Sequence, residues 1–189
     1  MQAKIHRLSD YSPPSYLVTH VDLEIDLSKN PVHSTATLTI IPNPALKGHP
    51  NDLVLDGENM KLLHIELDNK PISSEAYELT DQSIIIKNVP KDKSFTLKTT
   101  TILGENTDLF GLYETEGIFL VKAETEGLRR VLFCNDRPDN LATYKTTIIA
   151  NQESYPVLLS NGKLVNKKQL GMDRHSATWL DDVPKPSYL

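Results

Sequence analysis

The 189-residue sequence contains a single cysteine, Cys134, so it can form neither an internal disulfide bond nor a zinc site built from cysteine pairs. It has no Asn-x-Ser/Thr glycosylation site, and the N-terminal residues Met1–Leu8 lack the apolar core of a secretory signal. These absences are typical of a cytoplasmic protein, and we expect that location.

An excess of basic residues is also missing. The chain has 20 basic and 25 acidic residues, which gives a formal net charge of −5. Because basic faces supply much of the affinity for nucleic acid and for anionic membranes, we expect neither partner. The longest stretch without Asp, Glu, Lys or Arg, residues 30–46, contains three prolines and cannot form a membrane-spanning helix.

Familiar catalytic motifs are absent as well. The sequence contains no H-E-x-x-H zinc motif, no G-x-S-x-G nucleophile elbow, no P-loop and no G-x-G-x-x-G. We therefore expect no catalytic residue, no metal ligand and no cofactor in this chain.

The chain is instead rich in β-branched residues, with 39 Val, Ile and Thr against only 8 Ala and 8 Gly. Such residues favour strands, because they pack well on a pleated, half-buried surface. Val21–Leu27 alternates apolar and acidic residues, which is the period-two pattern of a strand with one exposed face. The same reasoning predicts strands over Thr35–Ile40, Leu63–Leu67, Ser83–Val89, Phe95–Ile102, Ile118–Ala123, Arg130–Phe133 and Lys145–Ala150.

These patterns predict an all-β fold with about ten to fourteen strands, in a large, mainly antiparallel structure that is saddle-like or a sandwich. Helix should make up less than about 15% of it, with one helical turn expected within Pro138–Tyr144. Asn161-Gly162 separates two apolar runs and predicts a tight type I′ hairpin. The last residues, Pro184–Leu189, are typical of the opening of a strand. We therefore expect residues 1–189 to form one domain of a longer protein.

Six segments, taken in order, closely resemble the N-terminal domain of the bacterial aminopeptidase N family of gluzincin zinc metallopeptidases. The resemblance extends from about Asp10 to Leu189. The segments are Asp10–Tyr16, Leu55–Leu62, Ala123–Arg129, Asp136–Asp139, Tyr155–Gly162 and Pro184–Leu189.

The resemblance implies a saddle-like β-domain that packs on a following catalytic domain. The family removes N-terminal amino acids from peptides. Its zinc ligands belong to that next domain, so zinc is implied for the longer protein and none for this chain. Gly57–Met60 shares letters with the family's G-x-M-E-N loop in another order, and we interpret it as a turn and a strand.

The resemblance also implies one wall of the substrate cleft. Val121–Arg129 matches the family's T-Q-C-E-A-E-G-F-R segment, whose first Glu binds the free α-amine of the substrate; that role corresponds to Glu124. A carboxylate forms strong, charge-assisted hydrogen bonds with an ammonium group. The simpler alternative is that Glu124 and Glu126 are solvated acids at a strand end.

Lys122 departs from the family, which has Gln at this position, and Ala123 replaces its Cys. A lysine beside an ammonium-binding site is repulsive unless it pairs with Glu124 or turns away. This departure leaves open the side-chain preference of the first subsite, and with it activity itself.

Asp136-Arg137-Pro138-Asp139 also matches the family, and we predict that Asp136, Arg137 and Asp139 form an Arg–carboxylate turn that supports the cleft. Arg129 and Arg130 are expected to pair with nearby acids.

Two other functions stay open. The chain could belong to a non-catalytic relative in which this domain is a protein-interaction scaffold, which Lys122 would favour. It could also be an unrelated β-sandwich binding module. If the chain is a fragment of the enzyme, it is expected to be inactive on its own.

Overall fold

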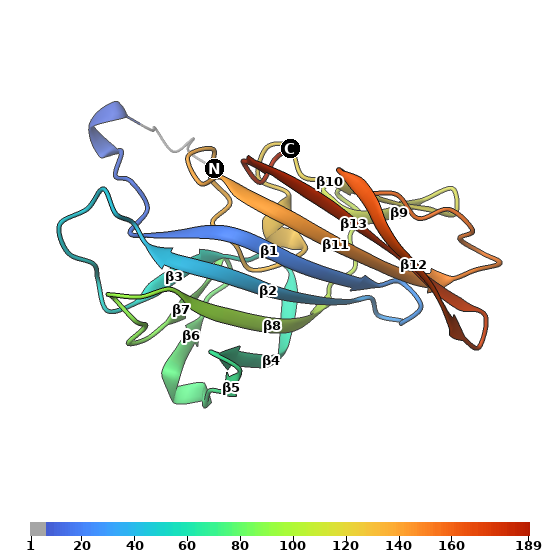
Figure 1. The fold of residues 1–189 in the computed structure, drawn as a ribbon, viewed down its shortest axis with the longest axis horizontal. Coiled ribbons are helices and arrows are strands. Elements are labelled where there is room, and N and C mark those ends of the chain that lie inside the picture. Colours follow the sequence, from blue (N-terminus) through green and yellow to red (C-terminus); the bar gives the residue numbers. More distant parts are fainter. Residues whose placement is uncertain (1–6) are drawn as a thin grey trace.

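Residues 7–189 are described by a computed structural model, which is drawn in Figure 1. The structure is 51% strand and 4% helical, so the predicted all-β fold with little helix is confirmed. Most of the N-terminal segment in which the sequence shows no secretory signal lies outside these residues. Within the described range, no helix is long and apolar enough to cross a membrane.

The described range contains thirteen strands and three short 3-10 helices. In chain order these are η1 (Leu8–Asp10), β1 (Tyr16–Asp26), β2 (His33–Pro42), β3 (Leu53–Asp56), β4 (Met60–Leu67), β5 (Lys70–Pro71), η2 (Ser74–Ala76), β6 (Tyr77–Leu79), β7 (Ser83–Ile86), β8 (Phe95–Leu103), β9 (Gly111–Thr115), β10 (Ile118–Lys122), η3 (Leu128–Arg130), β11 (Ala142–Asn151), β12 (Lys163–Gly171) and β13 (Arg174–Lys185).

Within residues 7–189, eight strands form one large sheet in the order β12-β13-β11-β1-β2-β8-β4-β5. A three-stranded sheet, β3-β7-β6, and the β9–β10 hairpin complete the fold. The pairing is mainly antiparallel, as predicted, but β1 and β11 run parallel. Figure 1 shows β1, β11 and β13 as long strands side by side.

The core lies between the large sheet, the three-stranded sheet and the segment 128–134. On β1, Val21, Leu23 and Ile25 are buried, because the period-two pattern places them on one face and the acids between them on the other. Ile84 and Ile86 of β7 are fully buried against the same core, which also includes Val131–Cys134. This packing places the segment after β10 next to the core.

Two of the predicted elements are wrong. Arg130–Phe133 is not a strand: η3 ends at Arg130, and Val131 and Leu132 continue as a buried turn. Pro138–Tyr144 holds no helical turn, since β11 already begins at Ala142. The first error has a physical reason. The short apolar run Val131–Phe133 is buried and has no exposed face, so its sequence pattern cannot distinguish a strand from a turn.

The predicted hairpin at Asn161-Gly162 is also wrong. The apolar run before it is not a strand; its Leu158 is buried in a second small cluster with Ala150 and Ala177. The tight turn of the β12–β13 hairpin instead falls at Met172–Asp173, where both residues have positive φ, +49° and +56°. Asn161-Gly162 is the entry to β12.

The large sheet ends at β12, which has no neighbour on its outer side among the residues described. All nine residues of β12 are exposed, and three of them are Lys163, Lys167 and Lys168. Its register with β13 shifts at two places, which are β-bulges or irregularities. Beyond β13, residues 186–189 form a turn and not the opening of a strand.

Candidate functional site

The turn that follows β10 carries both predicted substrate-binding residues. Lys122 is the last residue of β10, and Glu124 lies in residues 123–127, which we call the Glu124 turn. The N–H of Gly127 donates to the carbonyl of Ala123 at 2.7 Å and closes this turn. A Cβ atom at Gly127 would lie 2.1 Å from the carbonyl oxygen of Lys122, so only glycine permits this close return.

The side chain of Glu124 is exposed. Its carboxylate has no hydrogen bond and no ion pair with any residue that the structure describes. The carboxylate therefore keeps its whole acceptor capacity for a ligand.

Lys122 is exposed too. Its partner across the β9–β10 hairpin is Gly111, which has no side chain to cover it. Within residues 7–189 the ammonium group pairs with no acid, Glu124 included. One free cation and one free carboxylate thus lie two residues apart.

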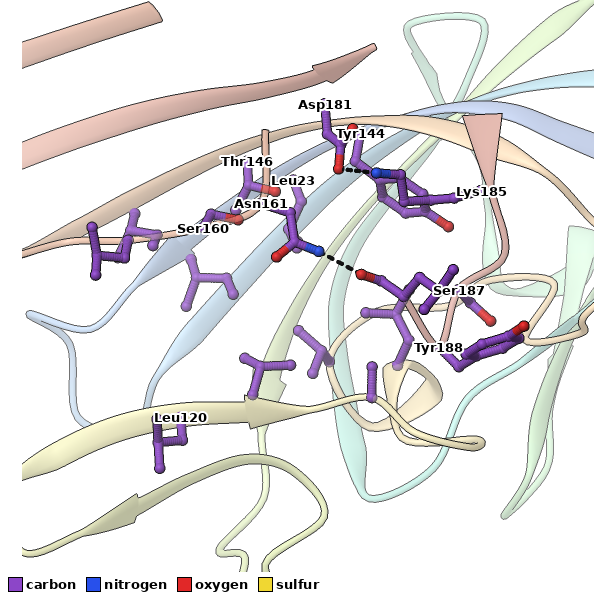
Figure 2. Close-up of a pocket in the computed structure, with 18 residues that line it drawn as sticks. Leu23, Leu120, Tyr144, Thr146, Ser160, Asn161, Asp181, Lys185, Ser187 and Tyr188 are labelled. Atoms are coloured by element: carbon purple, nitrogen blue, oxygen red, sulfur yellow. Dashed lines mark hydrogen bonds and ion pairs between the residues drawn. The ribbon is translucent and has the colours of Figure 1, made fainter. Parts of the chain in front are cut away.

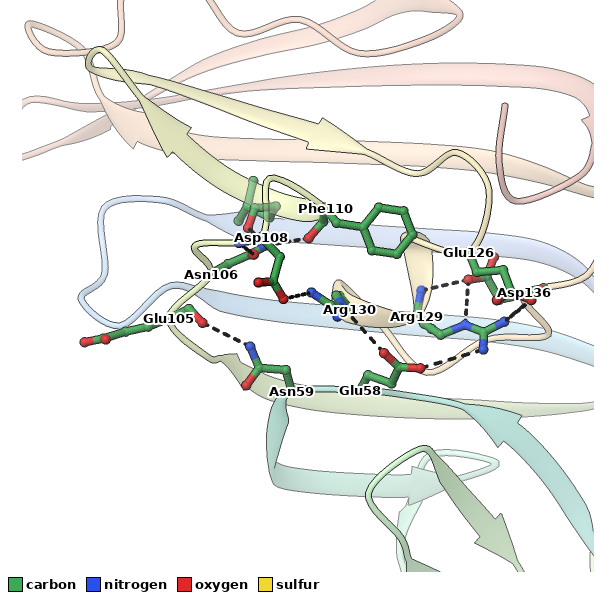
Figure 3. A network of polar contacts seen from close by, with 11 residues as sticks. Glu58, Asn59, Glu105, Asn106, Asp108, Phe110, Glu126, Arg129, Arg130 and Asp136 are labelled. Carbon is green, nitrogen blue, oxygen red and sulfur yellow. Dashed lines mark hydrogen bonds and ion pairs between the residues drawn. The ribbon is translucent and has the colours of Figure 1, made fainter. Parts of the chain in front are cut away.

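Arg129, in the helix η3, anchors the Glu124 turn to a buried carboxylate (Figure 3). Its Nε donates to Oδ2 of Asp136 at 3.0 Å, and its backbone N–H donates to the same oxygen at 3.2 Å. Its Nη2 donates to the backbone carbonyl of Asp136 at 3.2 Å. The carboxylate of Asp136 has no exposed surface, so this is a charge pair that the protein has removed from water.

Two further acids surround the guanidinium of Arg129. Its Nη2 lies 3.2 Å from Oε1 of Glu126, and its Nη1 lies 3.8 Å from Oε1 of Glu58. Burial lowers the pKa of Arg129, but the bond to Asp136 and the charges of Asp56 and Glu126 outweigh it, so the pKa is raised. The cation is therefore held charged among several carboxylates.

Arg130 extends the network in the other direction. Its Nη1 donates to Oδ2 of Asp108 at 2.8 Å, its Nε lies 3.5 Å from Oε2 of Glu58, and its guanidinium stacks 5.3 Å from the ring of Phe110. The prediction that Arg129 and Arg130 pair with acids is confirmed. Glu58, their shared partner, is not among the site residues predicted from the sequence, because Gly57–Met60 was interpreted as a turn and a strand.

Arg137 pairs with Asp139 in a two-pronged contact, with distances of 2.8 and 2.7 Å. Nη2 of Arg137 also donates to the carbonyl of Ser12, and the hydroxyl of Tyr11 donates to Asp139. The hydrogen bond from Arg137 lowers the pKa of Asp139. The four-residue segment is thus divided: Asp136 contacts Arg129, while Arg137 and Asp139 bind Ser12 and Tyr11.

Behind the Glu124 turn lies a cavity of about 400 Å³ (Figure 2). Val121 and Ala123 line it, whereas Lys122 and Glu124 do not. Its polar contacts are an ion pair between Asp181 and Lys185, and a hydrogen bond between Asn161 and the carbonyl of Leu189. The cavity is mostly apolar and separate from the two free charges. It is lined by Leu23, Ile25, Leu120, Val121, Ala123, Leu128, Val131, Tyr144, Thr146, Ile148, Leu159, Ser160, Asn161, Asp181, Lys185, Ser187, Tyr188 and Leu189.

The described residues do not fit a metal ion. Among residues 7–189, no group of three or more His, Cys, Asp or Glu side chains is arranged to hold one. Burial raises the pKa of the thiol of Cys134 well above its ordinary value, which disfavours the thiolate that a metal would need. This part of the chain therefore offers no set of three such ligands for a zinc ion.

Comparison with protein families gives a match over almost the whole chain. The family model described as the peptidase M1 N-terminal domain matches residues 12–189. Aminopeptidase N of Escherichia coli is 36% identical over 182 residues, which are 95% of this chain and 20% of that protein. Aminopeptidase N of Haemophilus influenzae is 35% identical over 191 residues, with 100% of this chain and 22% of that protein covered. The chain thus spans about a fifth of the length of these relatives.

Solved structures give the same result. The crystal structure of Legionella pneumophila aminopeptidase A in complex with aspartic acid matches with a TM-score of 0.96 and 63% identity, over 98% of this chain and 22% of that one. An M1 zinc metallopeptidase from Deinococcus radiodurans matches with a TM-score of 0.77 over 92% of this chain and 41% of that one. At 17% identity, the second match shows a shared fold alone.

Proposed function

Since the chain belongs to the peptidase M1 N-terminal domain family, we propose that residues 1–189 are the N-terminal domain of a longer zinc aminopeptidase. The observation that carries this proposal is the family match over residues 12–189, with relatives that are aminopeptidases. In this proposal the zinc and the groups that activate its water belong to the remainder of the protein, and the lack of a group of three or more His, Cys, Asp or Glu ligands among the described residues supports it. The contribution of this chain is to bind and orient the substrate.

Within this function, Glu124 binds the α-ammonium group of the substrate. The support is its exposed carboxylate, which has no partner among the described residues and is held on a short turn closed by Gly127. An ammonium group offers three donors, and a carboxylate accepts them in charge-assisted bonds. Fixing the amine also fixes the first peptide bond, which makes the reaction that of an exopeptidase.

The test is Glu124→Ala in the full-length protein, with steady-state kinetics on a peptide substrate that has a free N-terminus. Loss of a hydrogen bond to a charged partner costs about 1.5–3 kcal/mol, so kcat/KM should fall about 10- to 100-fold. The melting temperature should not change, because the side chain is exposed and supports no core.

The matched control is Glu153→Ala, which removes another exposed glutamate from a turn. It should leave kcat/KM unchanged. A folded Glu124→Ala variant with the kcat/KM of the wild type would contradict the amine-binding role. A folded wild-type protein without peptidase activity would favour the scaffold function over the enzyme.

Lys122 supports a finer proposal, that the enzyme prefers substrates with an acidic N-terminal residue. The side chain of that residue extends from the same carbon as the amine bound by Glu124, and Lys122 is a free cation two residues away. A cation near this position attracts a carboxylate and repels a basic side chain. The relative that is 63% identical was crystallised in complex with aspartic acid, which agrees with this preference.

This preference is tested by comparing kcat/KM on matched substrates that begin with Asp or with Ala. Lys122→Gln should lower the Asp-to-Ala ratio about tenfold or more, since a charged hydrogen bond is lost for one substrate alone. Activity on the Ala substrate should stay the same or rise. Lys122→Arg, which keeps the charge, should retain the preference; an unchanged ratio in Lys122→Gln would refute it.

A further inference from the structure

Carboxylates from three segments meet at the side chain of Arg129, and one of these segments, that of Glu58, is distant from it in sequence. Asp136 follows the buried segment 128–134, Glu58 lies between β3 and β4, and Glu126 belongs to the Glu124 turn. Figure 3 shows the guanidinium between these three carboxylates. The backbone supports the same junction, because the N–H of Glu58 donates to the carbonyl of Arg129 at 2.9 Å.

Arginine is suited to this junction for a geometric reason. Its planar guanidinium has five N–H donors in a fixed fork, so one side chain can bind several acceptors in set directions. The Arg129 side chain is 14% exposed and the Asp136 side chain is fully buried, so solvent screens their attraction weakly. Without the cation, the neighbouring carboxylates would repel one another.

The path from Arg129 to Glu124 is short. Glu126 is ion-paired with Arg129 at 3.2 Å, and the Ala123–Gly127 hydrogen bond closes the turn in which Glu124 lies. The Glu124 turn is therefore held at both of its ends, by β10 on one side and by Arg129 on the other.

We propose that Arg129 is a positioning residue for substrate binding: by joining Glu126, Glu58 and Asp136, it holds the Glu124 turn where the carboxylate of Glu124 meets the substrate amine. This proposal rests on the proposed function of Glu124. Arg129 does not touch the substrate and acts only through the position of Glu124. A small displacement of a positioned group is enough to lower catalysis substantially.

The experiment is a double-mutant cycle in the full-length protein, with Arg129→Lys, Glu124→Ala and the combined variant, on a peptide with a free N-terminus. Lysine keeps the charge but has no fork, so it cannot reach the three carboxylates together. Arg129→Lys alone should lower kcat/KM about tenfold. In the Glu124→Ala background the same change should have an effect of less than about twofold, because the group that Arg129 positions is already gone.

A merely structural role gives a different result. If Arg129→Lys lowers kcat/KM by the same factor in both backgrounds, the positioning role is overturned. If Glu124→Ala alone has no effect, it is the proposed function that fails. Arg174→Lys, the same change in a half-buried arginine of β13, is the matched control and should leave kcat/KM unchanged.

A second variant covers the case in which Arg129→Lys does not fold. Glu58→Gln removes one arm of the junction at a residue whose side chain is 26% exposed, so the fold should tolerate it. It should show the same pattern as Arg129→Lys, with a loss of kcat/KM that disappears in the Glu124→Ala background. An equal loss in both backgrounds would overturn the proposal here as well.

Discussion

Asp139 is a partly exposed acid with three polar contacts. It accepts two hydrogen bonds from Arg137 and one from the hydroxyl of Tyr11, and the Arg137 bond is the main cause of its lowered pKa. Since Arg137 also binds the carbonyl of Ser12, this pair attaches residues 11–12 to the turn after the core segment.

A lowered pKa of Asp139 gives its contribution to stability a definite pH dependence. The folded state holds the charged form more strongly, so the stabilisation is complete above the ordinary aspartate pKa of about 3.9 and disappears as the pH falls through the lowered value. At neutral pH, Asp139→Asn should reduce the free energy of unfolding by about 0.5–1 kcal/mol, because the pair is partly exposed and screened. Below about pH 3.9 the difference from the wild type should shrink.

Urea denaturation of the wild type and of Asp139→Asn across this pH range measures the effect. Asp92→Asn, at an exposed position in the loop before β8, is the control and should show no such dependence. A constant difference between wild type and Asp139→Asn at all pH values would mean that the ion pair is not its cause.

At the scale of the elements, the entry to β12 depends on Gly162. Its φ is +86°, and a Cβ atom there would lie 2.2 Å from the carbonyl oxygen of Leu180 and 2.7 Å from Cα of Asp181. Both neighbours are backbone atoms of β13, which cannot move aside without disturbing the β12–β13 pairing.

Gly162→Ala should therefore lower the free energy of unfolding by about 1–3 kcal/mol, since it combines a strained backbone with a steric clash. Gly171→Ala separates the two causes, because Gly171 also has a positive φ, +76°, but open space around its Cα. Thermal denaturation should show the larger loss for Gly162→Ala. Equal losses would show that backbone strain alone accounts for the effect.

Two of the strands that were predicted correctly, β1 and β8, share one property. β1 and β8 have one face in the core and the other toward solvent, so alternation in the sequence reports their strand structure directly. The segment Val131–Phe133 is buried all round and shows no alternation. The β12–β13 turn has Met172 and Asp173 at positive φ, where turn preferences favour asparagine and glycine.

The candidate site could be predicted only in part, for a related reason. The position of Glu124 after a strand follows from local pattern and family resemblance. The partnership of Glu58 with Arg129 and Arg130 joins residues about seventy positions apart, and no local pattern reports such a pairing. The position of Glu58 beside these two arginines arises only in the folded chain.

At the scale of the whole molecule, the charges of the site are divided between the interior and the surface. Asp136 and Arg129 lie against the core, and Glu124 and Lys122 lie at the surface, five and seven residues before Arg129 in the chain. A largely buried ion pair thus lies close in the chain to groups that stay free for a ligand. This arrangement agrees with the preference of functional sites for well-supported side chains.

The outer edge of β12 has a consequence for how copies of this protein behave in solution. A long edge strand presents unpaired N–H and C=O groups, on which a second molecule could add a strand and begin aggregation. Lys163, Lys167 and Lys168 lie along this edge, and two register shifts interrupt its pairing with β13. Strand addition would bring the lysines of two copies together and require a flat edge that the irregularities disturb. The nine residues of β12 therefore form an exposed edge of the sheet, and their lysines and irregular pairing also oppose polymerisation through that edge.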